Sequence, residues 1–130
     1  MVSRAGFFDI HMKEMDMETD LAIFKACADA TRLRILFLLV ERELCVCELV
    51  EVLEMPQGKI SRHLAVLKNA ELVRDRREGL WIYYSLKEME TELKRQLGAY
   101  LSEARFEQAE ADRSRLEELT RADQLCGPPR

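Results

Sequence analysis

The chain has 130 residues, of which 48% are hydrophobic and 34% charged. This balance excludes a disordered chain, and the length suits one domain with its own core. No apolar run is long enough to span a membrane and no secretory signal follows Met1, which predicts a cytoplasmic protein without a membrane partner. Its four cysteines would then lie in a reducing compartment, which favours metal binding or redox chemistry over structural disulfides.

The net charge of −4 hides a pattern along the chain. Residues 1–55 carry 6 basic and 11 acidic side chains, residues 56–87 carry 7 and 3, and residues 88–130 carry 7 and 10. One basic block therefore lies between two acidic ones. This distribution is typical of a small DNA-binding surface on an acidic body.

The first half of the chain predicts three helices. Residues 1–15 have no clean period, but apolar residues on one face predict a helix over residues 16–28. Asp29 or Thr31 can cap a second helix that follows. A third helix is predicted over residues 45–54, where Val46, Leu49 and Leu53 repeat with helical spacing.

Cys45 and Cys47 lie at the start of this third helix. In a regular helix they would be about 200° apart, on opposite flanks of the apolar stripe and outside the core. Two such residues cannot reach one ion, so ion binding is expected to distort the first turn and shift the helix that follows. Paired thiolates at a helix N-terminus favour a thiophilic ion. The alternative is two buried thiols that act as small hydrophobic side chains.

A turn at Met55-Pro56 leads into a fourth helix over residues 57–69, and together the two helices predict a helix-turn-helix. Its apolar positions face inward, and its outer face and flanks are polar. The predicted DNA contacts on this helix are Gln57, Lys59, Ser61, Arg62 and His63. His63 lies about 60° from the inward centre, so a packed histidine near the core fits equally well.

Residues 72–86 predict a β-hairpin, because apolar and other side chains alternate around a Glu78-Gly79 turn. A hairpin after a reading helix is the arrangement of a wing. Arg76 and Arg77 are expected to contact phosphate or the minor groove, and the alternative is ordinary surface charge.

A single long helix is predicted from Lys87 to about Leu119. Its apolar seam is more than one small domain can cover, which predicts a partner helix and a homodimer. The seam consists of Met89, Leu93, Leu97, Tyr100 and Ala104. The domain is expected to span residues 1–122, with a frayed tail over residues 123–130.

Four segments together resemble the ArsR/SmtB-type metalloregulatory repressors. They are DATRLRIL (29–36), ELCVCEL (43–49), ISRHLAVLKNAELV (60–73) and REGLWIYYSL (77–86). The resemblance implies a mainly α-helical winged helix-turn-helix with a small β-hairpin, dimerising through its N- and C-terminal helices. It further implies a repressor that binds a palindromic double-stranded DNA operator and leaves it when an ion binds Cys45 and Cys47.

ELCVC resembles the thiolate site of arsenic, antimony, cadmium and lead sensors, so trivalent arsenic or antimony is the expected inducer and cadmium or lead the alternative. No organic cofactor is expected. The chain departs from the arsenic-sensing pattern at Val50, where a third cysteine is usual. It also has Ala30 in place of the usual proline, and it lacks the C-terminal histidines of the zinc-sensing branch.

The third ligand stays open among Cys27, Cys126 and His11. Cys27 matches an apolar core position of the family, Cys126 lies near the chain end, and His11 could reach a partner's site. A two-thiol site would still suffice for an organoarsenical, in which carbon takes one arsenic bond.

The sequence also bears on three rival functions. A thiol enzyme lacks a base near the cysteines, and Cys-x-Cys is not the Cys-x-x-Cys of a thiol oxidoreductase, so no enzyme activity is expected. A redox-sensing repressor stays an alternative. A pure protein-interaction module would not need the basic hairpin.

Overall fold

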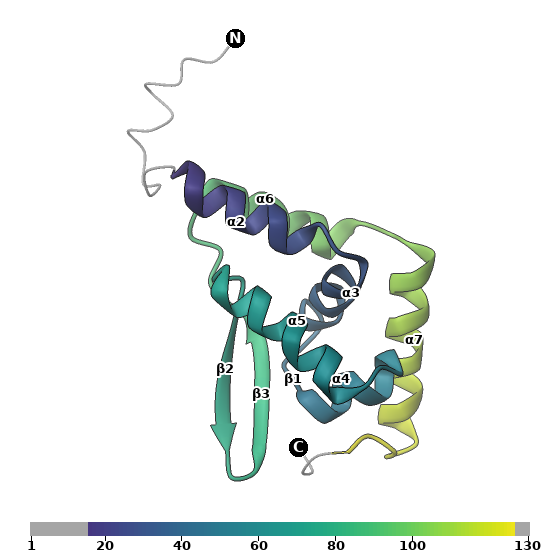
Figure 1. Cartoon of the computed structure of the whole chain (residues 1–130). Coiled ribbons are helices and arrows are strands. Elements are labelled where there is room, and N and C mark those ends of the chain that lie inside the picture. Colours follow the sequence, from purple (N-terminus) through teal and green to yellow (C-terminus); the bar gives the residue numbers. More distant parts are fainter. Residues whose placement is uncertain (1–15, 127–130) are drawn as a thin grey trace.

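The computed structural model describes residues 16–126, which form six helices and a small sheet (Figure 1). In chain order the elements are α2 (Met17–Cys27), α3 (Ala30–Leu39), β1 (Leu44–Cys45), α4 (Val46–Leu53), α5 (Gln57–Asn69), β2 (Val73–Glu78), β3 (Trp81–Leu86), α6 (Glu92–Glu103) and α7 (Glu107–Arg121). In the described part of the chain, no helix combines the length and apolar character needed to cross a bilayer.

Aspartates begin the first two helices. Asp16 Oδ1 accepts a hydrogen bond from the Glu18 amide (3.1 Å), and Asp29 Oδ2 accepts one from the Arg32 amide (3.0 Å). Such caps satisfy amides that have no partner inside the helix. Of the two predicted caps for α3, Asp29 is therefore the one used.

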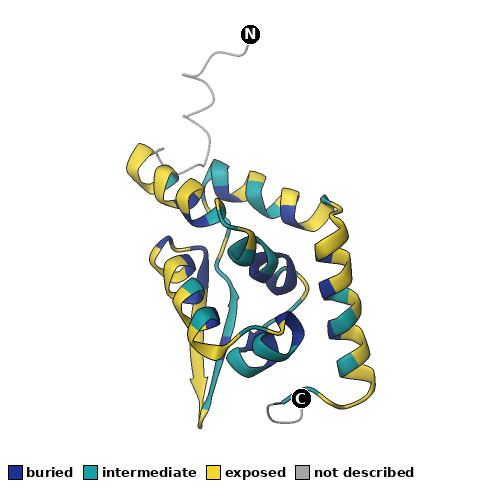
Figure 2. Cartoon of the chain, turned by 45° about the vertical axis from the view of Figure 1, so that its right-hand side comes forward, coloured by how far each residue is buried: buried dark blue, intermediate teal, exposed yellow. Residues whose placement is uncertain are grey.

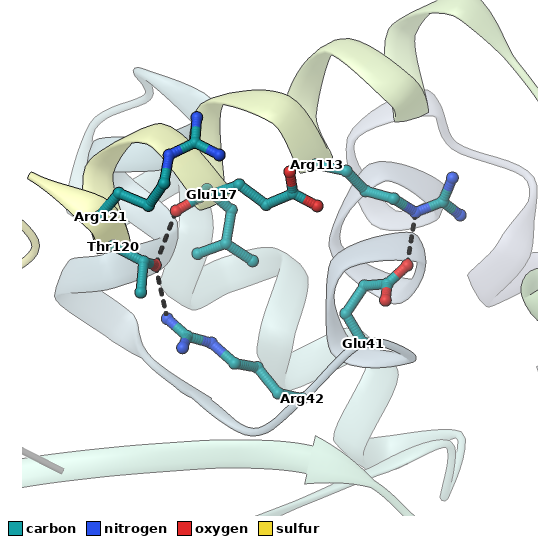
Figure 3. Close-up of a pocket in the computed structure, with 7 residues that line it drawn as sticks. Glu41, Arg42, Arg113, Glu117, Thr120 and Arg121 are labelled. Atoms are coloured by element: carbon teal, nitrogen blue, oxygen red, sulfur yellow. Dashed lines mark hydrogen bonds and ion pairs between the residues drawn. The ribbon is translucent and has the colours of Figure 1, made fainter.

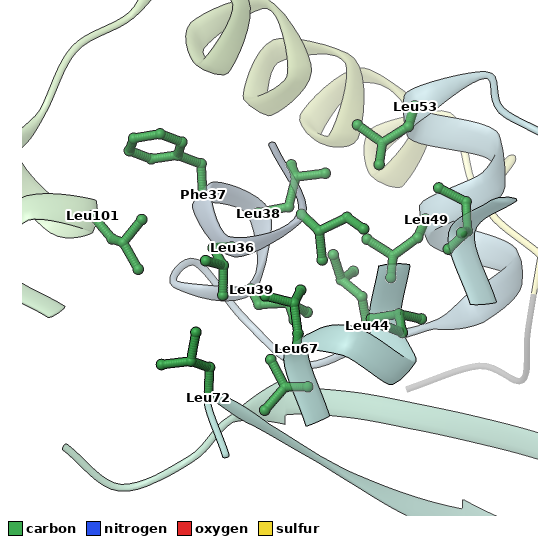
Figure 4. Packing of buried hydrophobic residues seen from close by; sticks show 14 of the residues in the cluster. Leu36, Phe37, Leu38, Leu39, Leu44, Leu49, Leu53, Leu67, Leu72 and Leu101 are labelled. Carbon is green, nitrogen blue, oxygen red and sulfur yellow. The ribbon is translucent and has the colours of Figure 1, made fainter. Parts of the chain in front are cut away.

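Helix α3 lies at the centre of the core, which explains its uninterrupted apolar run. Residues 35–39 are all buried. A helix that is apolar on every side is stable only when its neighbours surround it. Leu49 of α4 and Leu67 of α5 pack into the same cluster (Figure 4).

The predicted helix-turn-helix is confirmed as α4 and α5. Glu54 ends α4 in the left-handed region (φ 55°), and Pro56 occupies the N-cap position of α5. Helix α5 has the predicted bounds, and its inward residues Ile60, Leu64 and Leu67 are buried.

The predicted hairpin forms, and a short strand from the other side of the helix-turn-helix extends it. The order is β1-β3-β2, all antiparallel. Gly79 (φ 60°) allows the turn between β2 and β3. In the ladder, Tyr83 of β3 is opposite Cys45 on one side and Arg76 on the other. The wing is thus joined directly to the segment that carries the first cysteine of the pair.

The prediction of one long C-terminal helix is wrong, because residues 104–106 separate α6 from α7. Phe106 occupies the N-cap position of α7, and its ring centroid lies 5.7 Å from that of Phe37 and 6.3 Å from that of Tyr100. This aromatic cluster turns the chain back, so that α7 runs beside α3 and α4. Figure 2 shows its buried residues facing the core and its exposed residues facing outward.

Candidate functional site

Cys45 and Cys47 already converge. Cys45 precedes α4 in an extended conformation (φ −84°, ψ 164°), and its Sγ lies 3.2 Å from Cys47 Sγ. The expectation that a regular helix holds the two thiols apart, so that an ion must distort its first turn, is therefore wrong. Cys45 is also 1% exposed, so the prediction that it lies outside the core is wrong too, whereas Cys47 is half-buried.

Buried hydrogen bonds fix the position of Cys45. Its amide donates to Glu48 Oε1 (2.9 Å), which also holds the first turn of α4. Glu48 Oε2 lies 3.8 Å from the Arg42 guanidinium, and Arg42 donates to Thr120 Oγ1 of α7 (3.3 Å). These contacts link the first thiol to the C-terminal helix.

A cavity of about 360 Å³ lies between this part of α7 and the α3–β1 connection (Figure 3). Its lining consists of Glu41, Arg42, Arg113, Leu116, Glu117, Thr120 and Arg121. Soft ions prefer sulfur and imidazole nitrogen, and this lining provides neither. The cavity therefore belongs to the α7 interface and not to a thiophilic site.

The structure adds a third cysteine sulfur to the pair. Cys126 is disulfide-bonded to Cys47, 79 residues away in sequence, with their Cα atoms 6.1 Å apart. The Cys126 amide donates to Glu51 Oε2 of α4 (3.3 Å). The Sγ atoms of Cys45, Cys47 and Cys126 all lie within 4.8 Å of one another, and we call these residues the thiol cluster.

The thiol cluster fits a thiophilic ion once the Cys47–Cys126 disulfide is reduced. Thiolate sulfurs bind a metal at about 2.3 Å, so sulfurs this close together can share one ion after small adjustments. Three sulfur ligands select soft ions over hard cations.

Cys27, another candidate ligand, stands apart from this cluster. Cys27 is the last residue of α2, packs partly buried against the hydrophobic core and is not a member of the thiol cluster. Burial raises the pKa of the Cys27 thiol, which favours its neutral form. His11 lies outside the described residues.

Helix α5 presents most of its predicted DNA contacts to solvent. Gln57, Ser61 and Arg62 are exposed, and Lys59 is half-buried. His63 instead turns toward α3, where its Nδ1 lies 3.1 Å from Arg32 Nη1 and 3.7 Å from Asp29 Oδ2. Of the two interpretations of His63, these contacts favour the packed histidine.

The two wing arginines predicted to contact DNA differ in their surroundings. Arg76 Nη2 lies 2.8 Å from Glu43 Oε1, a second ion pair joins it to Glu78, and its guanidinium lies 4.4 Å from the Tyr83 ring centroid. These carboxylates raise the pKa of Arg76, with hydrogen bonding to Glu43 as the main cause. Arg77 is exposed, and residues 16–126 offer it no ion pair.

Sequence reasoning could not single out Cys126 among the candidate third ligands, and it missed the pairing of Glu43 with Arg76. Cys126 has no spacing signal, because 79 residues separate it from Cys47. Glu43 and Arg76 are joined only through the register of the sheet, and a strand as short as β1 gives no period to detect.

Comparisons with known proteins agree with this arrangement. A family model described as bacterial regulatory protein, arsR family, matches residues 29–75. The arsenic resistance transcriptional regulator ArsR1 of Pseudomonas putida is 52% identical over 77 residues, which are 58% of this chain and 59% of that protein. The arsenical resistance operon repressor of Escherichia coli is 51% identical over 67 residues, 51% of this chain and 57% of the repressor. The chain thus spans less than two thirds of the length of both relatives.

The fold also resembles a solved structure. This is the homodimeric winged helix-turn-helix DNA-binding domain of Mb0332 from Mycobacterium bovis, described as a possible ArsR-family transcriptional regulator. It is 31% identical, with a TM-score of 0.58, and the match covers 66% of this chain and 77% of that one.

Proposed function

The chain belongs to the arsR family of bacterial regulatory proteins, and we propose that it is a transcriptional repressor released from its DNA operator by a thiophilic metalloid. The observation that carries this proposal is the convergence of Cys45 and Cys47 at the start of α4, 3.2 Å apart. Helix α4 packs directly on α5, whose outer face is polar and exposed. A ligand of the thiols would therefore act on the element next to the DNA-facing helix.

Trivalent arsenic or antimony is the proposed inducer. Both are soft and bind thiolates, as do the alternatives cadmium and lead. Two relatives are named for arsenic or arsenical resistance, which supports the metalloid. For the cadmium or lead alternative, the thiols release their protons to solvent on binding, so affinity for either metal ion rises with pH as the thiolates form.

The contacts around Cys45 could couple ion binding to DNA binding. Cys45 pairs with Tyr83 in the sheet, and Tyr83 pairs with Arg76. Glu43, two residues before Cys45, holds the Arg76 guanidinium. A shift of this segment on ion binding would change both the packing of α4 on α5 and the position of the wing.

The test uses the reduced 130-residue chain and a fluorescent duplex that this chain selects from a random-sequence pool. We expect arsenite to release the duplex from the wild-type protein. The variants Cys45→Ala and Cys47→Ala should bind the duplex but keep it when arsenite is added. Alanine is preferred at position 45 because a serine hydroxyl buried there without a hydrogen bond would cost about 1–3 kcal/mol.

The matched control is Cys27→Ala, which removes a thiol outside the thiol cluster and should leave release unchanged. A Cys45→Ala, Cys47→Ala double variant that still leaves its operator on addition of arsenite would place the sensor elsewhere. Parallel titrations with antimonite, cadmium, lead and zinc rank the inducers.

The Cys47–Cys126 disulfide favours one second candidate, a thiol-based redox sensor. Oxidation by a peroxide would join the two thiols, with two electrons passing to the peroxide and water as its product. Release by peroxide without arsenite would support this candidate. An enzyme is not supported, because His63, the one histidine within residues 16–126, is engaged by Arg32 and is not part of the thiol cluster.

A further inference from the structure

We infer that Cys126 is the third ligand of the ion, so that the sensor joins the start of α4 to a C-terminal arm formed by residues 104–126. This inference rests on the proposed function and names the full ligand set of the same site. It is drawn from the position of Cys126, whose sulfur lies with those of Cys45 and Cys47 within 4.8 Å. The structure thus completes the site within one chain.

The arm is anchored along its length, which makes the position of Cys126 specific. Arg34 of α3 forms two hydrogen bonds of 2.9 Å with the buried carboxylate of Asp112. Ala109 and Leu116 are buried in the core. An anchored arm holds its terminal thiol near α4 at a smaller entropic cost than a free tail would.

The last turn of the arm then directs Cys126 back to α4. Helix α7 ends at Arg121, and Asp123 takes a left-handed conformation (φ 53°) that reverses the chain. The Gln124 amide donates to the Leu119 carbonyl (2.9 Å), and Leu125 packs against the core. On the α4 side, Arg115 Nε donates a hydrogen bond to the Glu51 carbonyl (3.2 Å), and Glu51 Oε2 accepts one from the Cys126 amide.

Three thiols match the bonding of inorganic trivalent arsenic. Arsenous acid carries three hydroxyl groups, and each thiol displaces one of them. A sulfur–arsenic bond forms, an arsenic–oxygen bond breaks, and the thiol proton leaves with the hydroxyl as water, without any change of oxidation state. Cys45 and Cys47 alone would leave one hydroxyl on the arsenic, and Cys126 is placed to replace it.

The experiment compares the wild type with Cys126→Ser in the reduced 130-residue chain, without oxygen. Arsenite and phenylarsine oxide are the probes. In phenylarsine oxide, carbon takes one arsenic bond, so only two thiolates can bind. Affinity is measured from the ultraviolet absorption of the sulfur–arsenic bonds, and the thiols protected from an alkylating reagent are located by mass spectrometry.

We expect arsenite to protect Cys45, Cys47 and Cys126 in the wild type. Replacing even an outer partner of a metal site weakens binding by about 10–100-fold, so Cys126→Ser should weaken arsenite binding by at least about tenfold. Binding of phenylarsine oxide should stay unchanged. The control Cys27→Ser should bind both probes like the wild type.

Equal arsenite affinity in Cys126→Ser and the wild type would overturn the inference. Equal weakening for both probes would do so too, since Cys126 would then act by holding α4 and not as a ligand. Either result leaves the proposed function intact if arsenite still releases DNA from the wild type. Arsenite binding to all three thiols without DNA release would instead overturn the proposed function and keep the ligand set.

Discussion

Arg62 on α5 and Arg77 on the wing are both exposed, and within residues 16–126 neither is held by an ion pair. We expect them to act differently on DNA. Arg62→Ala should weaken the binding free energy for the selected operator by about 1–3 kcal/mol, because a helix in the major groove reads base edges. The variant should also discriminate less between DNA sequences. Arg77→Ala should weaken binding to every DNA sequence, because its expected contact is phosphate. The slope of the logarithm of the binding constant against the logarithm of the salt concentration should become shallower by about one.

Fluorescence anisotropy on the operator and on a random duplex, each at several salt concentrations, separates the two effects. Arg74→Ala is the matched control, because Arg74 is a wing arginine already paired with Glu88 (2.9 Å). This variant should lose less DNA affinity than Arg77→Ala. Equal losses on both duplexes for Arg62→Ala would argue against α5 as the reading helix.

At the scale of the element, α7 depends on a buried ion pair. Asp112 has a side-chain exposed fraction of 5%, and Arg34 has 24%. Arg34→Ala should cost about 3–5 kcal/mol of unfolding free energy, because it leaves a buried carboxylate without its charged partner and with only the neutral Gln108 amide (3.0 Å) as a side-chain donor. Asp112→Ala should cost less, about 1–3 kcal/mol, because the freed guanidinium can still reach water.

Urea unfolding of both variants measures these costs. The control is Arg95→Ala, whose exposed pair with Glu92 on α6 should contribute less than about 1 kcal/mol. If Asp112→Ala proves the more damaging of the two core-pair variants, the burial argument fails.

The elements show which parts of the fold the sequence could predict. The bounds of α5 follow from regular apolar spacing and from Pro56, both local signals. The break between α6 and α7 has no such signal, because residues 104–106 include neither glycine nor proline. Phe106 leaves the helix to pack on Phe37 and Tyr100, and that contact is tertiary.

The same distinction applies to the site. Cys45 and Cys47 are close in sequence, so their pairing could be predicted, but their geometry could not. Cysteine is not a usual N-cap residue, so the predicted helix began at Cys45, one residue before its actual start at Val46. That single residue decides whether the two sulfurs diverge or meet.

At the scale of the whole molecule, apolar side chains remain exposed at one end. Helices α2 and α6 both lie at this end, away from the wing tip (Figures 1 and 2). Met17, Leu21 and Phe24 of α2 are 84%, 48% and 60% exposed, and their spacing places them on one helical face. Tyr100 of α6 is 47% exposed. Leu93 and Leu97, for which the sequence predicts a partner helix, pack partly on the chain's own core.

We therefore predict a homodimer that buries the exposed face of α2, and the similar domain of Mb0332 is itself homodimeric. Phe24→Asp should convert the dimer to a monomer while leaving the unfolding free energy of the monomer nearly unchanged, because Phe24 is mostly exposed. Operator affinity should fall with it, since a dimer holds two half-sites at once.

Sedimentation velocity at micromolar concentration measures the assembly. Leu80→Asp, at the 95% exposed wing tip, is the control and should sediment as the wild type does. A wild-type chain that sediments as a monomer, or a Phe24→Asp variant that stays dimeric, would mean that another surface or none forms the interface.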